Sequence, residues 1–178
     1  MSIPAMSLTS SLPPARLTRF ATELFTAAGM DADKAATVAS LLVLTDTMGR
    51  RTHGLAMAPL YLADIAKGGM ALTGQPEVVK DTGATLVWDG NYLPGLWLMD
   101  QAIRLGMQRA ADLGVVTFAI RRSHHIGCLA ALVKQAADRG FIAIVQNSEP
   151  AARRVAPYGG REPLFTPNPM AIGYPAGG

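Results

Sequence analysis

The sequence predicts an α+β protein in which a helical N-terminal part is followed by a part that mixes helices and strands. Up to about residue 70, apolar residues recur at the i, i+3 and i+4 spacing of amphipathic helices. From about residue 76, short apolar runs alternate with helical segments, and glycines mark the junctions. The 178 residues are 49% hydrophobic and 16% charged, which is typical of a chain that buries a core and not of a disordered one.

Three helices are expected in the N-terminal part, over residues 13–28, 31–48 and 58–67. Each is followed by a glycine, which favours a helix end, and Pro13 and Pro14 suit the start of the first. The segment between the second and third helices contains GRRTHG and is predicted to be a connector. In the second helix the spacing turns five residues towards the core: Ala35, Val38, Ala39, Leu42 and Thr45.

The second part is predicted to contain five strands, over residues 77–80, 84–88, 115–120, 141–146 and 170–174, and two helices, over residues 96–113 and 129–138. The first two strands flank Thr82-Gly83 and predict a hairpin. The segments AADLG and AADRG each lead directly into a strand, which predicts that these helix–strand units pack onto one sheet. Residues 149–169 are rich in Pro, Gly and Arg and are expected to form a long ordered loop or a binding loop.

The small number of cysteines and histidines limits the disulfide bonds and metal sites that the chain can form. Cys128 is the single cysteine, so disulfide bonds and a cysteine-based metal site are excluded. The three histidines, His53, His124 and His125, are too few for a histidine-rich metal cage. No apolar run reaches the roughly 18 residues of a transmembrane helix, and the first fifteen residues lack the pattern of a secretory signal. We therefore expect a cytoplasmic globular protein with no membrane segment and no metal site.

Arginines are clustered in pairs, at Arg50-Arg51, Arg121-Arg122 and Arg153-Arg154. The first two pairs adjoin all three histidines, in RRTHG and RRSHHIG. Because the guanidinium group binds carboxylates and phosphates, these pairs indicate either an anion site or solvated surface charge. The net charge of +3 is too small to indicate nucleic acid, and no basic segment is interleaved with aromatic residues.

The three histidines are expected to have different roles. His125 lies where a predicted strand leads into a helix, the usual position of ligand contacts in α/β folds. The N–H groups of the first helical turn would lower its pKa, and a neutral histidine suits acid–base chemistry; the alternative is a structural histidine at a helix end. His53, in the connector, is either a packing or capping residue or a functional one. His124 is expected to be structural.

Familiar nucleotide-binding and nucleophile motifs do not occur. The sequence has no G-x-G-x-x-G after a strand, no G-x-x-x-x-G-K-[ST] and no G-x-S-x-G. Taken alone, the residues therefore predict a helical-plus-α/β domain with an anion site built from arginine and histidine.

Four motifs, in order, resemble those of one enzyme family. They are GRRTHGL at residues 49–55, RSHHIG at 122–127, QNS at 146–148 and PYGGREPLFTPNPMAIGYP at 157–175. Together they make the segment 17–176 similar to the malate/L-lactate dehydrogenases of the second type. This family, also described as sulfolactate/ureidoglycolate dehydrogenase-like, is distinct from the Rossmann-fold lactate dehydrogenases.

The resemblance implies NAD(P)-dependent oxidation of 2-hydroxy acids, or reduction of 2-oxo or cyclic imino acids. It implies a lead-in over residues 1–14, a helical domain over 15–75 and a non-Rossmann α+β cofactor domain over 76–178. Family members are about twice this length, so the chain corresponds to an N-terminal half with a truncated cofactor domain. Members are homodimers, and neither nucleic acid nor a membrane is implied as a partner. The alternative is a non-catalytic remnant that binds a ligand or a partner.

The resemblance also implies site residues. His125 is the first candidate for the acid–base residue, and His53 is its partner on the substrate side. Arg50 is the candidate clamp for the substrate carboxylate, with Thr52 beside it. Residues that match segments near the cofactor, NAD or NADP, are Asn147, Ser148, Asn168, Pro169 and Pro175.

Three positions depart from the family pattern. Arg122 replaces the usual Asn, Arg51 a common Asp, and Pro167 the Thr of G-T-N-P. The two arginines add positive charge and favour either a more acidic substrate or relaxed constraint at these positions.

Overall fold

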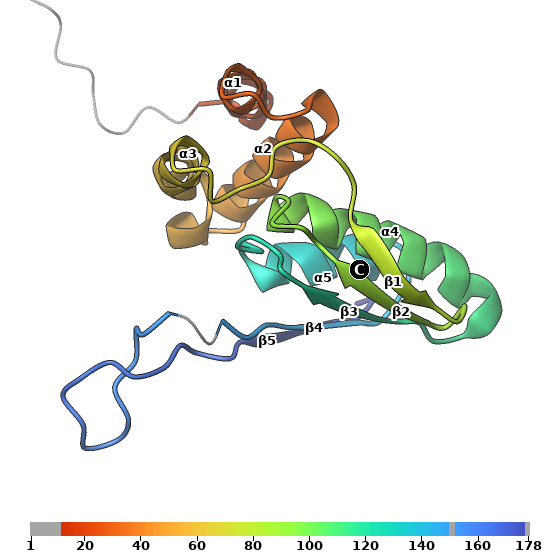
Figure 1. Ribbon diagram of the computed structural model, residues 1–178. Coiled ribbons are helices and arrows are strands. Elements are labelled where there is room, and N and C mark those ends of the chain that lie inside the picture. Colours follow the sequence, from red (N-terminus) through yellow and green to blue (C-terminus); the bar gives the residue numbers. More distant parts are fainter. Residues whose placement is uncertain (1–11, 150–151, 177–178) are drawn as a thin grey trace, which may run out of the picture.

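The computed structural model describes residues 12–149 and 152–176. Its elements are α1 (Pro14–Ala27), α2 (Ala32–Thr47), the 3₁₀ turns η1 (Arg51–His53) and η2 (Leu55–Met57), α3 (Ala58–Ala66), β1 (Glu77–Asp81), β2 (Thr85–Asp89), α4 (Gly95–Leu113), β3 (Thr117–Arg121), α5 (Leu129–Ala137), β4 (Ala143–Gln146) and β5 (Met170–Gly173). Figure 1 shows the three N-terminal helices above the mixed part. The mixed helix and strand architecture expected from the sequence is confirmed, and the predicted ends agree with the observed ends to within about two residues.

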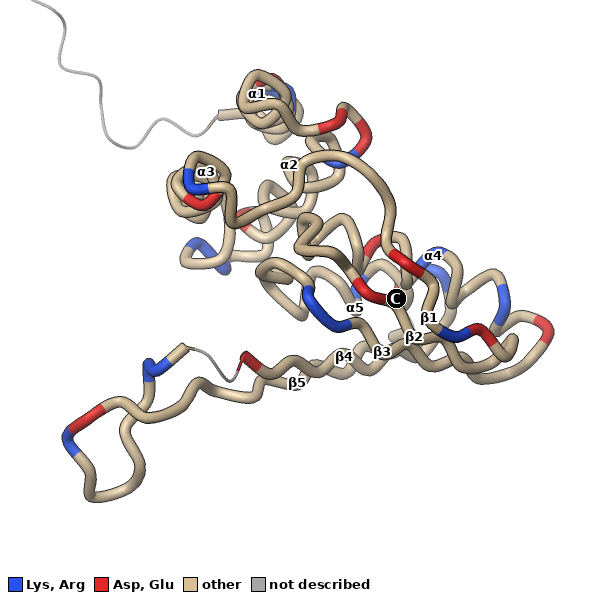
Figure 2. The backbone as a smooth tube through the Cα atoms, viewed as in Figure 1, with Lys and Arg blue, Asp and Glu red and all other residues tan. Residues whose placement is uncertain are grey.

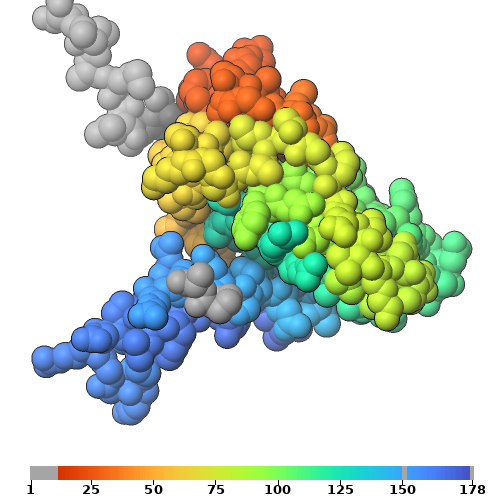
Figure 3. Space-filling model, in the orientation of Figure 1, coloured from red at the N-terminus to blue at the C-terminus, as the bar shows by residue number. Residues whose placement is uncertain are grey.

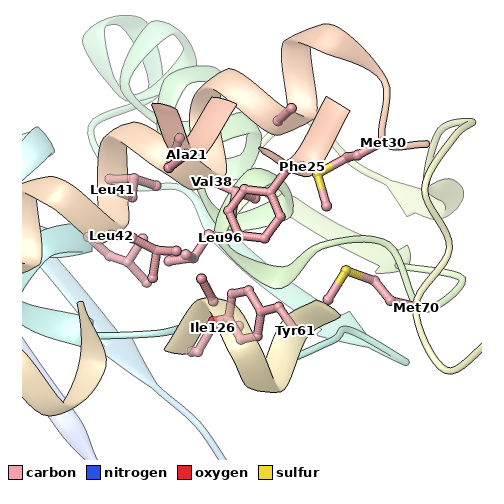
Figure 4. Close-up of a cluster of buried hydrophobic side chains, with 14 of the residues drawn as sticks. Ala21, Phe25, Met30, Val38, Leu41, Leu42, Tyr61, Met70, Leu96 and Ile126 are labelled. Carbon is pink, nitrogen blue, oxygen red and sulfur yellow. The ribbon is translucent and has the colours of Figure 1, made fainter. Parts of the chain in front are cut away.

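The N-terminal helices enclose an apolar core around α2. The five residues of α2 predicted to face inward are all buried, and Phe25 of α1 is fully buried beside them. The same cluster includes Leu96 of α4 and Ile126 of the loop before α5 (Figure 4). The helical part therefore packs on the mixed part through one continuous core, since a helix with an apolar stripe must bury it against another element.

Two separate sheets lie below the helices. β1 and β2 form the predicted antiparallel hairpin, and β3 pairs with β2 in parallel after α4 has crossed over. β4 pairs only with β5, in a second, antiparallel sheet. The prediction that the two helix–strand units share one sheet is therefore wrong. The AAD-x-G repeat determines where each helix ends and the next strand begins. Strand pairing depends instead on contacts between distant segments, and β4 pairs with β5, which lies beyond the long loop.

A long loop was predicted over residues 149–169, and its described residues 152–169 form an arm that projects from the body (Figures 1 and 3). Its two sides are joined by an isolated antiparallel bridge between Val155 and Phe165. Where the arm begins and ends, the Asn147 N–H donates to the carbonyl of Pro169 at 3.1 Å. Tyr158 is completely exposed in the arm.

The outer face of the β4–β5 sheet is mostly apolar and is exposed. Alternate residues point away from α5, and the outer face carries exposed Gln146 and three apolar residues, Ile144, Met170 and Ile172, each more than half exposed. Neither strand carries a charged residue (Figure 2). We call these three residues the outer β4–β5 face. Across the part of the chain that the structure describes, no helix has the length and hydropathy needed to span a bilayer.

Candidate active site

The segment that carries His124 and His125 follows the carboxyl end of β3 and is attached to the loop after β2. The Tyr92 N–H donates to the carbonyl of Arg122 at 2.6 Å, and the His124 N–H donates to that of Leu93 at 3.2 Å. Gly95, at the start of α4, lies so close to the carbonyls of His124 and His125 that a β-carbon would collide with both. The neighbouring ends of two parallel strands and a glycine thus hold this segment in place, at the position where α/β folds bind ligands.

The connector between α2 and α3 brings His53 to the same place. The carboxylate of Asp46 accepts the N–H of Leu55 at 2.9 Å and fills the space where a β-carbon of Gly54 would lie. The rings of His53 and His125 then face each other, with centroids 6.1 Å apart and planes 27° from parallel. The structure therefore brings together two histidines that are 72 positions apart in the sequence.

α3 supplies the side chains behind the histidines. The hydroxyl of Tyr61 lies 2.8 Å from Nδ1 of His125, and the carboxylate of Asp64 lies 3.2 Å from Nε2 of His124. The Tyr61 ring also packs edge-on against both histidine rings. His124 thus binds α3, in agreement with its expected structural role. Among the described residues, His125 forms hydrogen bonds only through Nδ1, which leaves Nε2 available.

His125 is a neutral base at pH 7. Burial, followed by the charges of His53, His124 and Arg154, lowers the pKa of His125 to about 4. The sequence also predicted a lowered pKa for His125. The leading cause, however, is burial and not the N-terminus of a helix, since α5 begins four residues later at Leu129. Burial likewise lowers the pKa of His124, and Asp64 partly opposes that shift.

The arginine pairs do not all face the histidines. Arg121 and Arg122 both donate to the fully buried carboxylate of Asp89, at 2.9 and 2.7 Å, and hold the pKa of Asp89 at about 2. The positive charge of Arg122 is therefore paired with the Asp89 carboxylate and does not serve to bind an acidic substrate. Arg50, in contrast, is exposed in the connector and has no ion pair with another described residue.

The residues matched to cofactor segments lie at both ends of the β4–β5 sheet. The hydrogen bond between Asn147 and Pro169 joins the first end, where Ser148 and Asn168 also lie. Pro175 lies beyond the opposite end, because Gly173 pairs with Ala143 there. The first end is near the histidines, since the charges of Glu149 and Arg154 act on His124 and His125.

Two further features lie outside this arrangement. A hollow of about 320 Å³ is lined by Gly68, Gly69, Met70, Ala71, Asn91 and Tyr92, and contains none of the predicted site residues. Within residues 12–149 and 152–176, no group of three His, Cys, Asp or Glu side chains is arranged to hold a metal ion.

Comparison with known proteins decides the family. The family model described as malate/L-lactate dehydrogenase matches residues 12–178, which is nearly the whole chain. This chain belongs to the malate/L-lactate dehydrogenase family. The resemblance carried by the four motifs is therefore confirmed.

Three members illustrate the similarity. Hydroxycarboxylate dehydrogenase B of Escherichia coli K12 is 30% identical over 88% of this chain and 43% of its own length. (2R)-3-sulfolactate dehydrogenase (NADP(+)) of Chromohalobacter salexigens is 30% identical over 85% and 45%. The structure of malate dehydrogenase from Pyrococcus horikoshii superposes with a TM-score of 0.85 at 30% identity, over 93% of this chain and 47% of that one. The chain thus spans about half the length of the family members it matches.

Sequence reasoning missed two residues of this candidate site, Tyr61 and Asp64, and did not connect Arg154 with the histidines. Tyr61 and Asp64 hold the histidines, and the charge of Arg154 reaches His125. Tyr61 has the spacing of a core residue of α3, so the pattern gives no indication of its hydrogen bond. The sequence singled out Arg154 in the third arginine pair, but only the fold brings the arm near the histidines.

Proposed function

We propose that this chain forms the histidine-bearing half of an oxidoreductase that transfers a hydride between NAD or NADP and a small 2-hydroxy or 2-oxo acid. Family membership supports this proposal, and one structural observation carries it: a neutral, half-buried His125 faces His53 at the carboxyl end of a parallel strand pair. A neutral imidazole in such a position can exchange a proton with a substrate oxygen near pH 7.

Each residue has a role in this proposal. When a hydroxy acid is oxidised, His125 takes the hydroxyl proton at Nε2 and becomes an imidazolium; when an oxo acid is reduced, Nε2 presents an N–H to the substrate oxygen. His53 and Thr52, whose hydroxyl lies 2.9 Å from Nδ1 of His53, contact the substrate from the opposite side. Arg50 binds the substrate carboxylate, for which its exposed guanidinium group is free. The nicotinamide, when bound, accepts or supplies the hydride.

The residues present fit one end of a nicotinamide cofactor. The side chains of Asn147, Ser148 and Asn168 make no hydrogen bond with other described residues, so their amide and hydroxyl groups remain available at the end of the sheet nearest the histidines. Pro169 and Pro175 flank β5 and fix where that strand begins and ends. These residues would hold the cofactor, and the charged Arg153 and Arg154 beside them would favour its anionic part.

The same resemblance supports three broader proposals. The protein acts in the cytoplasm, it forms a homodimer, and residues 15–75 and 76–178 are its helical and cofactor-binding domains. A second candidate, a non-catalytic module that binds a partner, is favoured by the exposed outer β4–β5 face.

The proposal is tested by binding and turnover with the purified 178-residue chain. Malate, lactate and sulfolactate are titrated while the ring resonances of His53 and His125 are followed by NMR, and reduction of NAD and NADP is followed by absorbance. We expect saturable shifts at both histidines that are lost in Arg50→Ala, and little or no turnover. Resonance shifts confined to other regions would contradict the assigned site. Histidine shifts that persist in Arg50→Ala would show that Arg50 does not bind the substrate carboxylate.

A further inference from the structure

The nitrogen of His125 that faces the protein has two hydrogen-bond neighbours. The Tyr61 hydroxyl lies 2.8 Å from Nδ1, and the backbone N–H of Gly127 lies 3.3 Å from the same atom. Two polar groups directed at one ring nitrogen determine which nitrogen of a neutral imidazole carries the proton.

Both neighbours are donors. A backbone N–H can only donate, so Nδ1 must offer its lone pair to Gly127. Tyr61 is 2% exposed, and burial raises its pKa, which keeps the hydroxyl protonated and able to donate. Both groups therefore donate to Nδ1 and share its single lone pair, and the ring proton belongs on Nε2.

The fold fixes both donors. Gly127 has a φ of +66°, in the left-handed region that favours glycine, and the side chain of Leu96 lies where a β-carbon would project. The Tyr61 ring is held between Phe25 of the helical core and His124. Neither the Tyr61 ring nor the Gly127 backbone can move away from Nδ1 without disturbing the core.

We propose that Tyr61 is a positioning residue which, with the backbone N–H of Gly127, keeps the ring proton of His125 on Nε2, so that His125 presents an N–H to the reacting oxygen of its substrate. The arrangement follows from contacts within this chain, and only the identity of that oxygen rests on the proposed function. A neutral N–H in this position stabilises the negative charge that develops on the oxygen of a 2-oxo acid during reduction.

The hydroxyl of Tyr61 also allows the opposite state. Before Nε2 can accept a proton, the ring releases its Nε2 proton to solvent and takes up a proton at Nδ1, and the Tyr61 hydroxyl can then rotate to accept a hydrogen bond from the Nδ1 N–H. The N–H of Gly127 cannot. Tyr61 is therefore the one of the two neighbours that can serve both protonation states of the ring, and a phenylalanine there would serve neither.

The test is NMR of ring-¹⁵N-labelled histidine in the full 178-residue chain, with His125→Gln used to assign the resonances. We expect a protonated Nε2 and an unprotonated Nδ1 at neutral pH. In Tyr61→Phe, which keeps the ring packing, the two nitrogen shifts should move towards each other as the tautomers mix. Tyr92→Phe, at an exposed tyrosine in the loop after β2, is the control and should change neither shift.

A proton on Nδ1 of His125 in the unmodified chain would overturn the proposal. Unchanged ¹⁵N shifts of His125 in Tyr61→Phe would show that Tyr61 does not position the ring proton. Thermal unfolding of Tyr61→Phe checks that the chain still folds. None of these measurements needs substrate or cofactor, so a lack of substrate-induced shifts at His53 and His125 would count against the proposed function and leave the tautomer assignment intact.

Discussion

The histidine site and the β4–β5 sheet differ in what covers their apolar side chains. Around the histidines, Phe25, Tyr61 and Leu96 are enclosed by the chain's own helices. On the outer β4–β5 face, paired Ile144 and Ile172 are more than half exposed. Contiguous apolar residues on a sheet face mark a surface that packs against another polypeptide. The chain thus encloses the histidine site by itself and leaves the outer β4–β5 face uncovered.

The largest effect, on the rate of hydride transfer, is expected from a substitution in the enclosed histidine site. In any form of the protein that shows turnover, His125→Ala should slow hydride transfer by about 10²–10⁴-fold, because the proton exchanged with the substrate oxygen loses its acceptor. His53→Ala should mainly raise KM. The measurement is steady-state kinetics, with circular dichroism to show that the variants fold. If His125→Ala kept nearly full activity and His53→Ala did not, the acid–base role would move to His53.

A matched pair of truncations compares the two regions directly. Leu42→Ala removes a fully buried side chain from α2 and should lower the free energy of unfolding by about 2–5 kcal/mol through the cavity it leaves. Ile144→Ala removes an exposed side chain and should change it by less than about 0.5 kcal/mol. Urea unfolding measures both. Equal losses would mean that the outer β4–β5 face is already covered, for instance in a dimer.

The pH dependence of stability reports on His125. Its pKa is about 4 in the folded chain and about 6.5 in the unfolded one, so between these values the unfolded state binds more protons. Stability should therefore be complete above about pH 6.5 and fall as the pH is lowered towards 4, by about 1–2 kcal/mol after allowance for partial exposure.

Two variants check the origin of this dependence. His125→Gln should flatten the stability curve over that range in urea unfolding. Arg154→Ala, on the arm, should raise the pKa of His125 in an NMR titration, since the charge of Arg154 lowers it. An unchanged pKa would show that the arm does not remain near the histidines in solution.

The smallest effect on stability is expected from charge on the open face. Ile144→Lys combined with Ile172→Lys should leave the free energy of unfolding within about 0.5 kcal/mol and reduce self-association, because the two side chains are paired and exposed. Analytical ultracentrifugation measures the association. Val78→Lys, at an exposed position of β1, is the control and should not change it. If the double variant associated as strongly as the unmodified chain, the surface through which copies of the chain associate would lie outside the outer β4–β5 face.

Local chemistry was enough to predict most of the fold. Glycines and prolines end and begin helices through their backbone preferences, so α1, α2 and α3 were predicted from residues such as Pro14, Gly29 and Gly49. The hairpin of β1 and β2 followed from apolar runs around Thr82-Gly83. The pairing of β4 with β5 could not be predicted, since an arm of more than twenty residues separates them and no local pattern encodes the partner.

By itself, then, the sequence determined the helices and strands, the family motifs and His53 and His125 as candidates, because these depend on local backbone preferences and residue chemistry. Only the tertiary structure decided what surrounds those candidates. It directed Arg122 to Asp89, placed Tyr61 and the N–H of Gly127 on Nδ1 of His125, and lowered the pKa of that histidine by burial. Burial and hydrogen-bond partners come from segments far apart in the chain, so they exist only once the chain has folded.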